Sequence, residues 1–273
     1  MDAATWNAAG PRARHILSLK SAAHAARVPL VFSHVSAAAL WGLPILGQWH
    51  GSPVHLVVGT STGGRSSRGI RRHCVDMTLA ATAVVHGLLA TSIERTLIDL
   101  AVSTPFASAV MAWDFAIEHP SPLTTKENIR GELERLAITR GRKRIETVLA
   151  FAVTNSGSPG ESLSRARFLE LGFPAPALQV KFRHHTGVVD RVDFDWEEFD
   201  HIGEFDGLGK YRNPRFMSGL TAEEVVIREK QREDRLRTKR SHVTRWEWAD
   251  ALHPERLAAI LTDAGLPRRR VRA

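Results

Sequence analysis

The segment VVDRVDFDWEEFDHIGEFDG, residues 188–207, decides the expected fold of this chain. Apolar and charged residues alternate on both sides of a polar stretch, which is the pattern of an antiparallel hairpin with one buried face. We therefore expect strands at residues 188–195 and 201–205, joined by a turn at residues 197–200. This prediction also fixes which side chains of the two strands face each other.

The expected register brings two like charges together. With the turn centred on residues 198–199, Asp193 lies directly across from Glu204, with Cβ atoms about 5 Å apart. The same register pairs Arg191 with Asp206 on this charged face. The opposite face carries apolar side chains: Val192, Phe194 and Phe205. Opposed carboxylates destabilise a sheet unless they are compensated, and a divalent cation bound by their oxygens would do so.

The elements expected on both sides of the hairpin give an α/β order. Upstream, a helix begins at Glu161 and ends at Gly172, a residue type that favours helix C-termini. The other elements are a strand at 178–182, a helix at 221–239, a strand at 242–246 and a helix at 254–264. The order is αβββαβα, and Glu161 is a candidate third oxygen ligand beside Asp193 and Glu204.

The turn-forming stretch NSGSPG, residues 155–160, marks a boundary. We expect a mixed α+β, mainly helical domain at residues 1–154, the α/β domain at 155–266 and a basic tail at 267–273. The first domain is expected to hold a helix at 21–27, a short helix after Ser33, paired strands at 54–58 and 70–75, and a helix from about Ser92.

The charge balance bears on the class of partner. The chain has 37 Lys and Arg residues, only seven of them Lys, against 29 Asp and Glu, which gives a net charge of +8. Such an excess favours nucleic acid through the release of counterions. An Arg-rich proteome would produce the same balance, so composition alone does not decide between the two interpretations.

Cysteine usage and hydropathy bear on the compartment. Cys74 is the only cysteine, which excludes an internal disulfide and fits a reducing, cytoplasmic location. No segment reaches the roughly 18 apolar residues that a membrane-spanning helix needs. Residues 1–6 show no basic region followed by an apolar one, so neither a secretion signal nor a membrane partner is expected.

Several short motifs follow one another across residues 155–250. They are Glu161-Ser162-Leu163-Ser164-Arg165, Pro176 with Gln179, Val192-Asp193-Phe194, Gly203-Glu204-Phe205-Asp206-Gly207 with Lys210-Tyr211, the stretch from Glu229 to Arg237, and Val243-Thr244-Arg245-Trp246. In this order they resemble the PD-(D/E)XK, restriction-endonuclease-like superfamily, and within it the relatives of very-short-patch-repair endonucleases. The core of that superfamily has the order αβββαβ, which matches the order expected here.

The resemblance implies a magnesium-dependent site. In that superfamily the positions of Asp193 and Glu204 bind one or two Mg²⁺ (or Mn²⁺) ions, and the helix glutamate, here Glu161, often joins them. A lysine two residues after the second acid usually orients the water or stabilises charge. Asp206 stands at that position, so we expect Lys210 or Lys230 to supply the ammonium group.

Contacts with DNA are assigned to polar and basic residues around this site: Arg165, Gln179, Arg228, Arg232 and Arg235. Structural interpretations of these residues stay open. Arg232 and Arg235 lie one helical turn from acidic residues, a pattern equally typical of a solvated ion-pair surface. Glu161 equally fits a charge that is favoured at a helix N-terminus. Gln179 equally fits a polar residue at a strand edge, and Asp206 equally fits a residue of an ordinary turn.

The first part of the chain carries a separate resemblance. The stretches from Ser33 to Pro44, Val54-His55-Leu56 and Thr91 to Ala101 resemble the AbiEi-type antitoxin region of abortive-infection toxin–antitoxin systems. The resemblance covers about residues 30–105. It implies a transcriptional regulator that binds DNA, with a cognate toxin as a partner.

These patterns lead to two hypotheses of function. The first is a Mg²⁺-dependent endonuclease, or a nuclease-derived defence factor, that acts on DNA through Asp193, Glu204 and Lys210 or Lys230. The alternative is a non-catalytic DNA-binding regulator or antitoxin that uses the nuclease fold as a scaffold. The histidines predict no metal site, since the pair His184-His185 falls in a turn and no Cys–His spacing exists.

Overall fold

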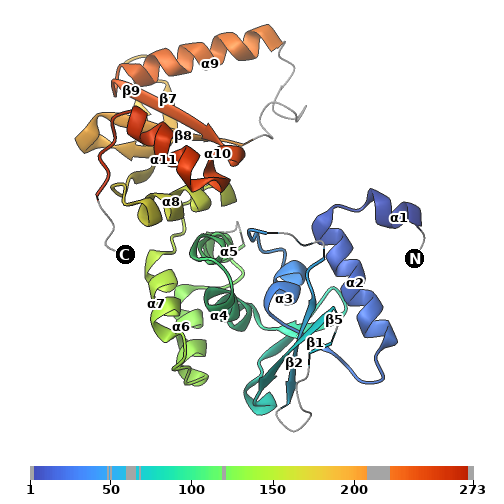
Figure 1. Cartoon of the computed structure of the whole chain (residues 1–273). Helices are drawn as coiled ribbons and strands as arrows, with labels where there is room; N and C mark the ends of the chain where they lie inside the picture. Colours follow the sequence, from blue (N-terminus) through green and yellow to red (C-terminus); the bar gives the residue numbers. More distant parts are fainter. Residues whose placement is uncertain are drawn as a thin grey trace. The chain divides into compact units, whose positions relative to one another are not determined.

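The computed structural model describes residues 3–47, 49, 51–59, 66–67, 69–118, 121–207 and 222–269. The chain divides into two compact units, Met1–Thr154 (unit 1) and Asn155–Ala273 (unit 2). The described residues form eleven α-helices and two sheets, one of five strands and one of four (Figure 1). Each sheet mixes parallel and antiparallel pairs, so the expected α/β class is confirmed. Among the described helices, none has the length and apolar character needed to cross a membrane.

Unit 1 contains the five-stranded sheet, in the order β3-β2-β1-β5-β4. Its strands are β1 (Val31–Phe32), β2 (Val54–Gly59), β3 (Ile70–Val75), β4 (Thr82–Val85) and β5 (Leu88–Thr91). Strand β2 runs antiparallel to β1 and parallel to β3, while β5 runs parallel to β1 and antiparallel to β4. The predicted strands at 54–58 and 70–75 therefore exist and pair. The pattern missed β1, β4 and β5, because two to four residues are too few to show an alternation.

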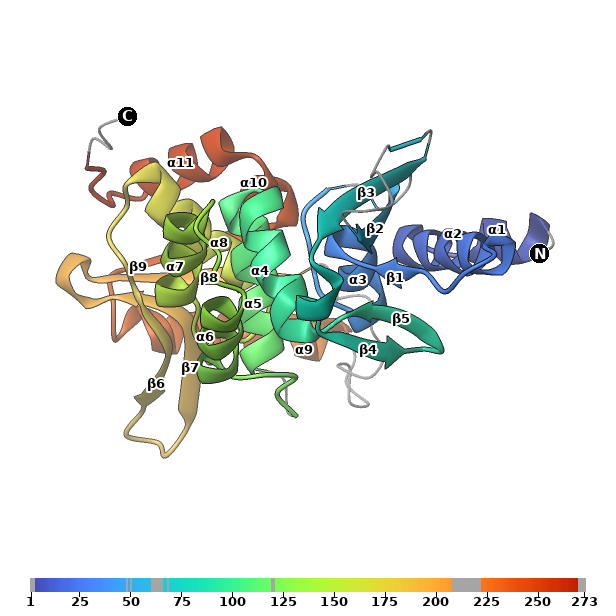
Figure 2. The ribbon, with the colours of Figure 1, turned by 90° about the horizontal axis from the view of Figure 1, so that it is seen from below.

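Seven helices belong to unit 1: α1 (Ala3–Ala8), α2 (Pro11–Ala25), α3 (His34–Trp41), α4 (Ile93–Ser103), α5 (Phe106–Glu118), α6 (Lys126–Arg135) and α7 (Arg142–Phe151). Helix α3 packs against both the sheet and α4, and α4 to α7 lie side by side (Figure 2). Ser33 is the N-cap of α3, and Gly42 ends it at φ 77°, as the sequence predicted. The predicted helix at 21–27 is wrong in its bounds, since α2 begins at Pro11, a residue favoured at the first helical position.

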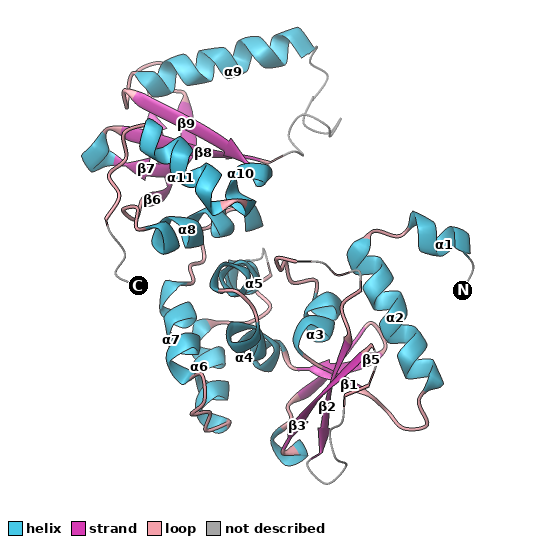
Figure 3. Cartoon of the chain, viewed as in Figure 1, coloured by secondary structure: helices cyan, strands magenta, loops and turns pink. Residues whose placement is uncertain are grey.

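Unit 2 contains the four-stranded sheet, in the order β6-β7-β8-β9. Its elements are α8 (Pro159–Leu171), β6 (Ala177–Arg183), β7 (Val189–Trp196), β8 (His201–Asp206), α9 (Ala222–Arg237), β9 (His242–Glu247), α10 (Trp248–Leu252) and α11 (Pro254–Asp263). Helix α9 covers one face of the sheet, and α8, α10 and α11 cover the other (Figures 1 and 3). The observed order αβββαβ opens the unit as predicted, and α10 was missed. Whether this is the endonuclease-like fold stays a prediction.

The register of the β7–β8 hairpin follows the sequence prediction. Phe194 pairs with Gly203 and Trp196 with His201, and the β7–β8 pairing ends there, one residue before Asp193 and Glu204. The charged face is nevertheless not open to solvent, because α9 lies on it and Glu204 is only 2% exposed.

The expected apolar face of β7 is interrupted at Asp193. Val192 packs with Leu236 of α9, whereas Phe194 packs edge-to-face on Phe168 of α8, on the opposite side of the sheet. The expectation of one continuous apolar face through Val192 and Phe194 is therefore wrong. On the neighbouring strand β6, Gln179 has φ 54°, a left-handed conformation that is rare outside glycine. At this position the side chains of β6 and β7 change the side of the sheet to which they point.

Candidate functional site

Two acidic side chains from different elements of unit 2 meet at Gln179 of β6. Its Nε2 donates a hydrogen bond to Glu161 Oε2 on α8 and lies 3.4 Å from Asp193 Oδ1 on β7. Asp193 Oδ2 also accepts a hydrogen bond of 2.9 Å from the backbone N–H of Phe205 on β8. The side chain of Gln179 thus links the start of α8 to the centre of the sheet.

Glycine is required where the chain passes over these carboxylates. Gly157 has φ 82°, and a Cβ atom there would lie 2.6 Å from Glu161 Oε2 and 2.8 Å from Gln179 Nε2. Glu161 occupies the first turn of α8, where Ser158 caps its N–H, so its location also suits the helix dipole. Its side chain is nevertheless buried at 7% exposure, beyond what a helix-end charge needs.

Glu204 is held by a guanidinium group. Arg232 of α9 contacts both carboxylate oxygens, at 2.7 Å to Oε1 and 2.8 Å to Oε2. Burial raises the pKa of Glu204, and the charge of Asp193 adds to this, whereas the bond and charge of Arg232 lower it. The sequence assigned Arg232 to DNA, and the structure places it as the counter-charge of a buried acid.

Arg245 supplies a second guanidinium at the same carboxylate. It pairs with Glu204 across the parallel strands β8 and β9, with its Nη2 3.9 Å from Glu204 Oε2. Its Nη1 lies 3.4 Å from Asp206, and its Nη2 contacts Glu229 of α9. A permanent positive charge therefore stands beside Asp206, the residue found where the resembling proteins carry lysine. Sequence reasoning did not assign Arg245 a role, since only the parallel pairing reveals this contact.

Of the two lysines expected in the site, only Lys230 is described, and it does not reach the site. Lys210 lies outside the described residues. Lys230 is exposed on α9, two residues before Arg232, and two helical steps turn a side chain by about 200°. Lys230 therefore points away from the side of α9 on which Arg232 reaches Glu204.

The remaining assigned DNA contacts divide by burial. Arg165 is 7% exposed, one turn after Glu161 on α8, whereas Arg228 is exposed on α9. Arg235 forms a two-bond ion pair with Asp190, at 2.8 and 2.9 Å. Only Arg228 of this group thus presents a largely solvated charge.

Two ion-paired aspartates of β7 were not singled out from the sequence. Asp190 lies between Arg235 and His184, whose Nε2 is 3.0 Å from Asp190 Oδ2. Asp195 forms a two-bond pair with Arg240, at 2.9 and 3.0 Å. These pairs fasten α9 and the chain after it to the sheet, and no local sequence pattern reports them.

The donor set suits a hard divalent cation. The carboxylates of Glu161 and Asp193 converge on Gln179, whose Oε1 is buried and accepts no hydrogen bond among the described residues. An orphaned buried oxygen beside two acids is a ligand type that Mg²⁺ or Mn²⁺ accepts. Glu204 would join this set only by sharing its oxygens with Arg232.

Unit 1 contains a group of histidines that the sequence did not identify. One nitrogen each of His34, His55 and His73 lie within 4.8 Å of one another. Successive members of the group are 21 and 18 positions apart and form no motif, so only folding brings them together.

Comparison with known proteins gives a partial match. Two proteins of Mycobacterium tuberculosis, the uncharacterized proteins MT2308 (strain CDC 1551 / Oshkosh) and Rv2248 (strain ATCC 25618 / H37Rv), are each 30% identical to this chain over 137 residues. The match covers 49% of this chain and 48% of each relative, so the chain spans about half the length of the relatives it matches. No family model and no solved structure matches the chain.

Proposed function

We propose that unit 2 is a metal-dependent enzyme that hydrolyses phosphodiester bonds in DNA. The observation that carries this proposal is the approach of Glu161 of α8 and Asp193 of β7 to Gln179 of β6. Glu204 of β8, which Arg232 holds, is near enough to Asp193 for their charges to interact. Neighbouring carboxylates are stabilised by positive charge, and Gln179 Oε1, which is buried and accepts no hydrogen bond among the described residues, adds an oxygen donor. The ordered motifs of residues 155–250 support the same function by resemblance.

Mg²⁺ or Mn²⁺ would be held by Asp193, Glu161 and Gln179, and would supply water activation and charge stabilisation at the phosphate. Arg232 and Arg245 would hold the scissile phosphate, because a guanidinium matches phosphate with two parallel hydrogen bonds. Neither arginine can take a proton from water, since the guanidinium stays protonated in proteins. Because Arg232 binds Glu204 in the absence of DNA, the binding of a phosphate would draw Arg232 away from Glu204 and free this carboxylate.

DNA nicking tests the proposal. Supercoiled DNA is incubated with the untagged chain and Mg²⁺, Mn²⁺ or a chelator. The isosteric substitutions Asp193→Asn and Glu204→Gln are expected to reduce nicking at least a hundredfold, because the first removes a ligand of the metal and the second removes the carboxylate that DNA binding would free beside it. Glu198→Gln serves as the matched control, since Glu198 is an exposed acid in the same hairpin. Nicking that persists in both site variants would refute the proposed nuclease function.

A second function is favoured by the pairing of Arg232 with Glu204. If this ion pair persists in solution, unit 2 binds DNA without cutting it, as a regulator or antitoxin would. The AbiEi-like first part of the chain agrees with this alternative, and a cognate toxin would then be a partner.

Salt dependence separates the two functions. A non-catalytic binder would retain DNA in the presence of a chelator, with an affinity that falls steeply as salt rises. Arg228→Ala would then reduce the salt slope by about one, because one phosphate contact is lost. Metal-dependent nicking by the unmodified chain would exclude this second function.

A further inference from the structure

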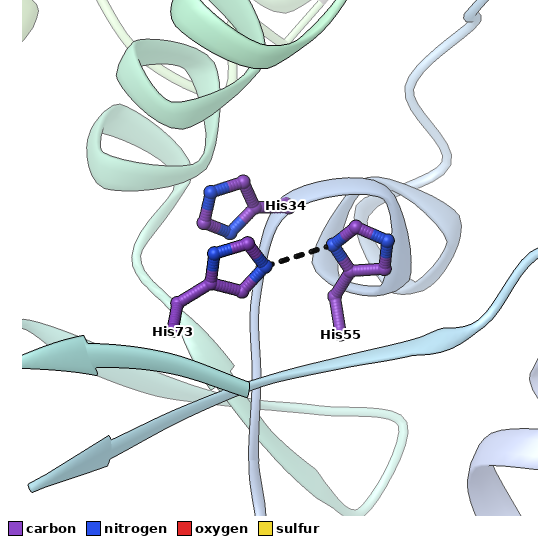
Figure 4. A group of neighbouring side chains, drawn as sticks. All are labelled: His34, His55 and His73. Carbon is purple, nitrogen blue, oxygen red and sulfur yellow. Dashed lines mark hydrogen bonds between the residues drawn. The ribbon is translucent and has the colours of Figure 1, made fainter. Parts of the chain in front are cut away.

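The histidine cluster of unit 1 is assembled from three elements. His34 opens α3, and His55 and His73 stand on the neighbouring parallel strands β2 and β3, offset by two residues in register (Figure 4). Residues two apart face the same side of a sheet, so both strand histidines point toward α3. The imidazoles of His34 and His73 stack with centroids 3.7 Å apart, and those of His55 and His73 lie 5.1 Å apart.

The nitrogen spacing approaches that of ligands on one ion. His55 Nδ1 and His73 Nε2 are 3.0 Å apart. Two nitrogens bound tetrahedrally to zinc at about 2.0–2.1 Å are themselves about 3.3 Å apart. The His34 nitrogen lies within 4.8 Å of the other two, so rotation of its ring would complete a set of three ligands.

Asp99 of α4 provides the supporting contact. Its Oδ1 accepts a hydrogen bond of 2.9 Å from Arg95, and its Oδ2 is buried, accepts no hydrogen bond among the described residues and lies 3.6 Å from His34 Nδ1. A histidine that binds a metal usually donates its other ring N–H to such a carboxylate. His34 also has φ 51°, a strained conformation for a residue with a Cβ atom.

We propose that His34, His55 and His73 bind a divalent transition-metal ion of the zinc type, with Asp99 orienting His34. Three imidazoles leave a fourth position open for water or a small anion. Arg71 and Arg95 approach the cluster and oppose a bare cation, which favours an anion as the fourth ligand.

Zinc binding by the untagged full chain tests the proposal. Equilibrium dialysis followed by metal analysis is expected to find one tightly bound Zn²⁺ per chain, and Co²⁺ to give the visible bands of a tetrahedral site. His55→Gln and His73→Gln are each expected to lower the zinc affinity at least tenfold. Asp99→Asn keeps the three ligands and is expected to lower it roughly 10- to 100-fold.

Two controls isolate the cluster. His86→Asn replaces an exposed histidine of unit 1 at φ 50°, which asparagine tolerates, and is expected to bind zinc as the unmodified chain does. Asp193→Asn disables the candidate site of unit 2 and is expected to leave zinc binding unchanged, so this test is independent of the nuclease proposal.

Circular dichroism establishes that each variant is folded, and half-buried His73 is the ligand whose replacement disturbs packing least. An unmodified chain that binds no zinc would overturn the proposal, and so would unchanged affinity in folded His55→Gln and His73→Gln.

Discussion

At the scale of single residues, unit 2 depends on ion pairs between α9 and buried acids of the sheet. The Glu204 side chain is 3% exposed and Arg232 is 23% exposed, so water screens this pair far less than it screens surface pairs. Removal of one partner leaves a buried charge without compensation, which costs more than the pair itself contributes. The same pair that would tune the candidate site therefore also stabilises the unit.

Arg232→Ala is expected to lower the free energy of unfolding by about 3 kcal/mol, because Glu204 then stays buried with only the more distant Arg245 as a counter-charge. Urea denaturation measures the loss. Arg237→Ala is the matched control on the same helix: its pair with Glu233 is 50% and 37% exposed, and the expected loss is below about 0.5 kcal/mol. Adding Glu204→Gln to Arg232→Ala should recover most of the stability. Equal losses for the two arginines would contradict the assignment.

His201 gives unit 2 a pH dependence. Burial, aided by the charge of His242, lowers the pKa of His201 from 6.5 to about 4. Between these two pH values the unfolded chain therefore binds more protons than the folded chain. The free energy of unfolding is thus unaffected by His201 above pH 6.5 and falls as the pH drops toward 4. His201→Gln should make the unfolding free energy less steep across this window, by at most about 1.4 kcal/mol per pH unit. Identical pH profiles for both proteins would refute the prediction.

At the scale of elements, the contact between α8 and β8 sets the position of Glu161. Gly160 precedes Glu161 in the first turn of the helix and lies against the ring of Phe205. A Cβ atom at Gly160 would come within 2.0 Å of Phe205 Cε1, so glycine allows the helix to approach the strand closely. Helix propensity alone would favour alanine there, and packing overrides it.

Gly160→Ala is expected to destabilise the protein by about 1–3 kcal/mol, because α8 or the Phe205 ring must move. Gly131→Ala in α6 is the matched control, since a Cβ atom there meets nothing within 4 Å. It should stabilise the chain by about 0.5–1 kcal/mol through helix propensity. Thermal unfolding of both variants measures the opposite signs, and a stabilising Gly160→Ala would show that the contact is looser than described.

At the scale of the whole molecule, the chain holds two units, each with its own sheet and its own candidate site. The apolar core of unit 1 includes Leu19, Phe32 and Leu40, and that of unit 2 is built around Phe168, Phe194 and Trp246. Units with separate cores unfold as separate cooperative transitions when the contact between them is weak.

Calorimetry is expected to resolve two transitions. Gly131→Ala in unit 1 should raise the midpoint of one, and Arg232→Ala in unit 2 should lower the midpoint of the other, with additive effects in the double variant. A single transition that both substitutions shift would show instead that the units unfold together.

The sequence by itself determined the local structure of unit 2. Alternating residues in 188–207 and the polar turn fixed the hairpin and its register, because strand period and turn length are properties of neighbouring residues. That register predicts Asp193 and Glu204 as neighbours, and Gly172, in a left-handed conformation, ends α8 as the sequence predicted.

Only the tertiary structure decided which charges compensate the acids and which histidines meet. Arg232 reaches Glu204 across 28 residues and Arg245 reaches it across a parallel strand pair. Among the described residues, the cations beside Glu204 are therefore arginines and not the predicted Lys230. The histidine cluster likewise depends on packing of α3 on β2 and β3. These contacts join segments that are distant in sequence, so no local pattern predicts them. A buried charge or imidazole needs a polar partner, and the element that packs against it supplies that partner.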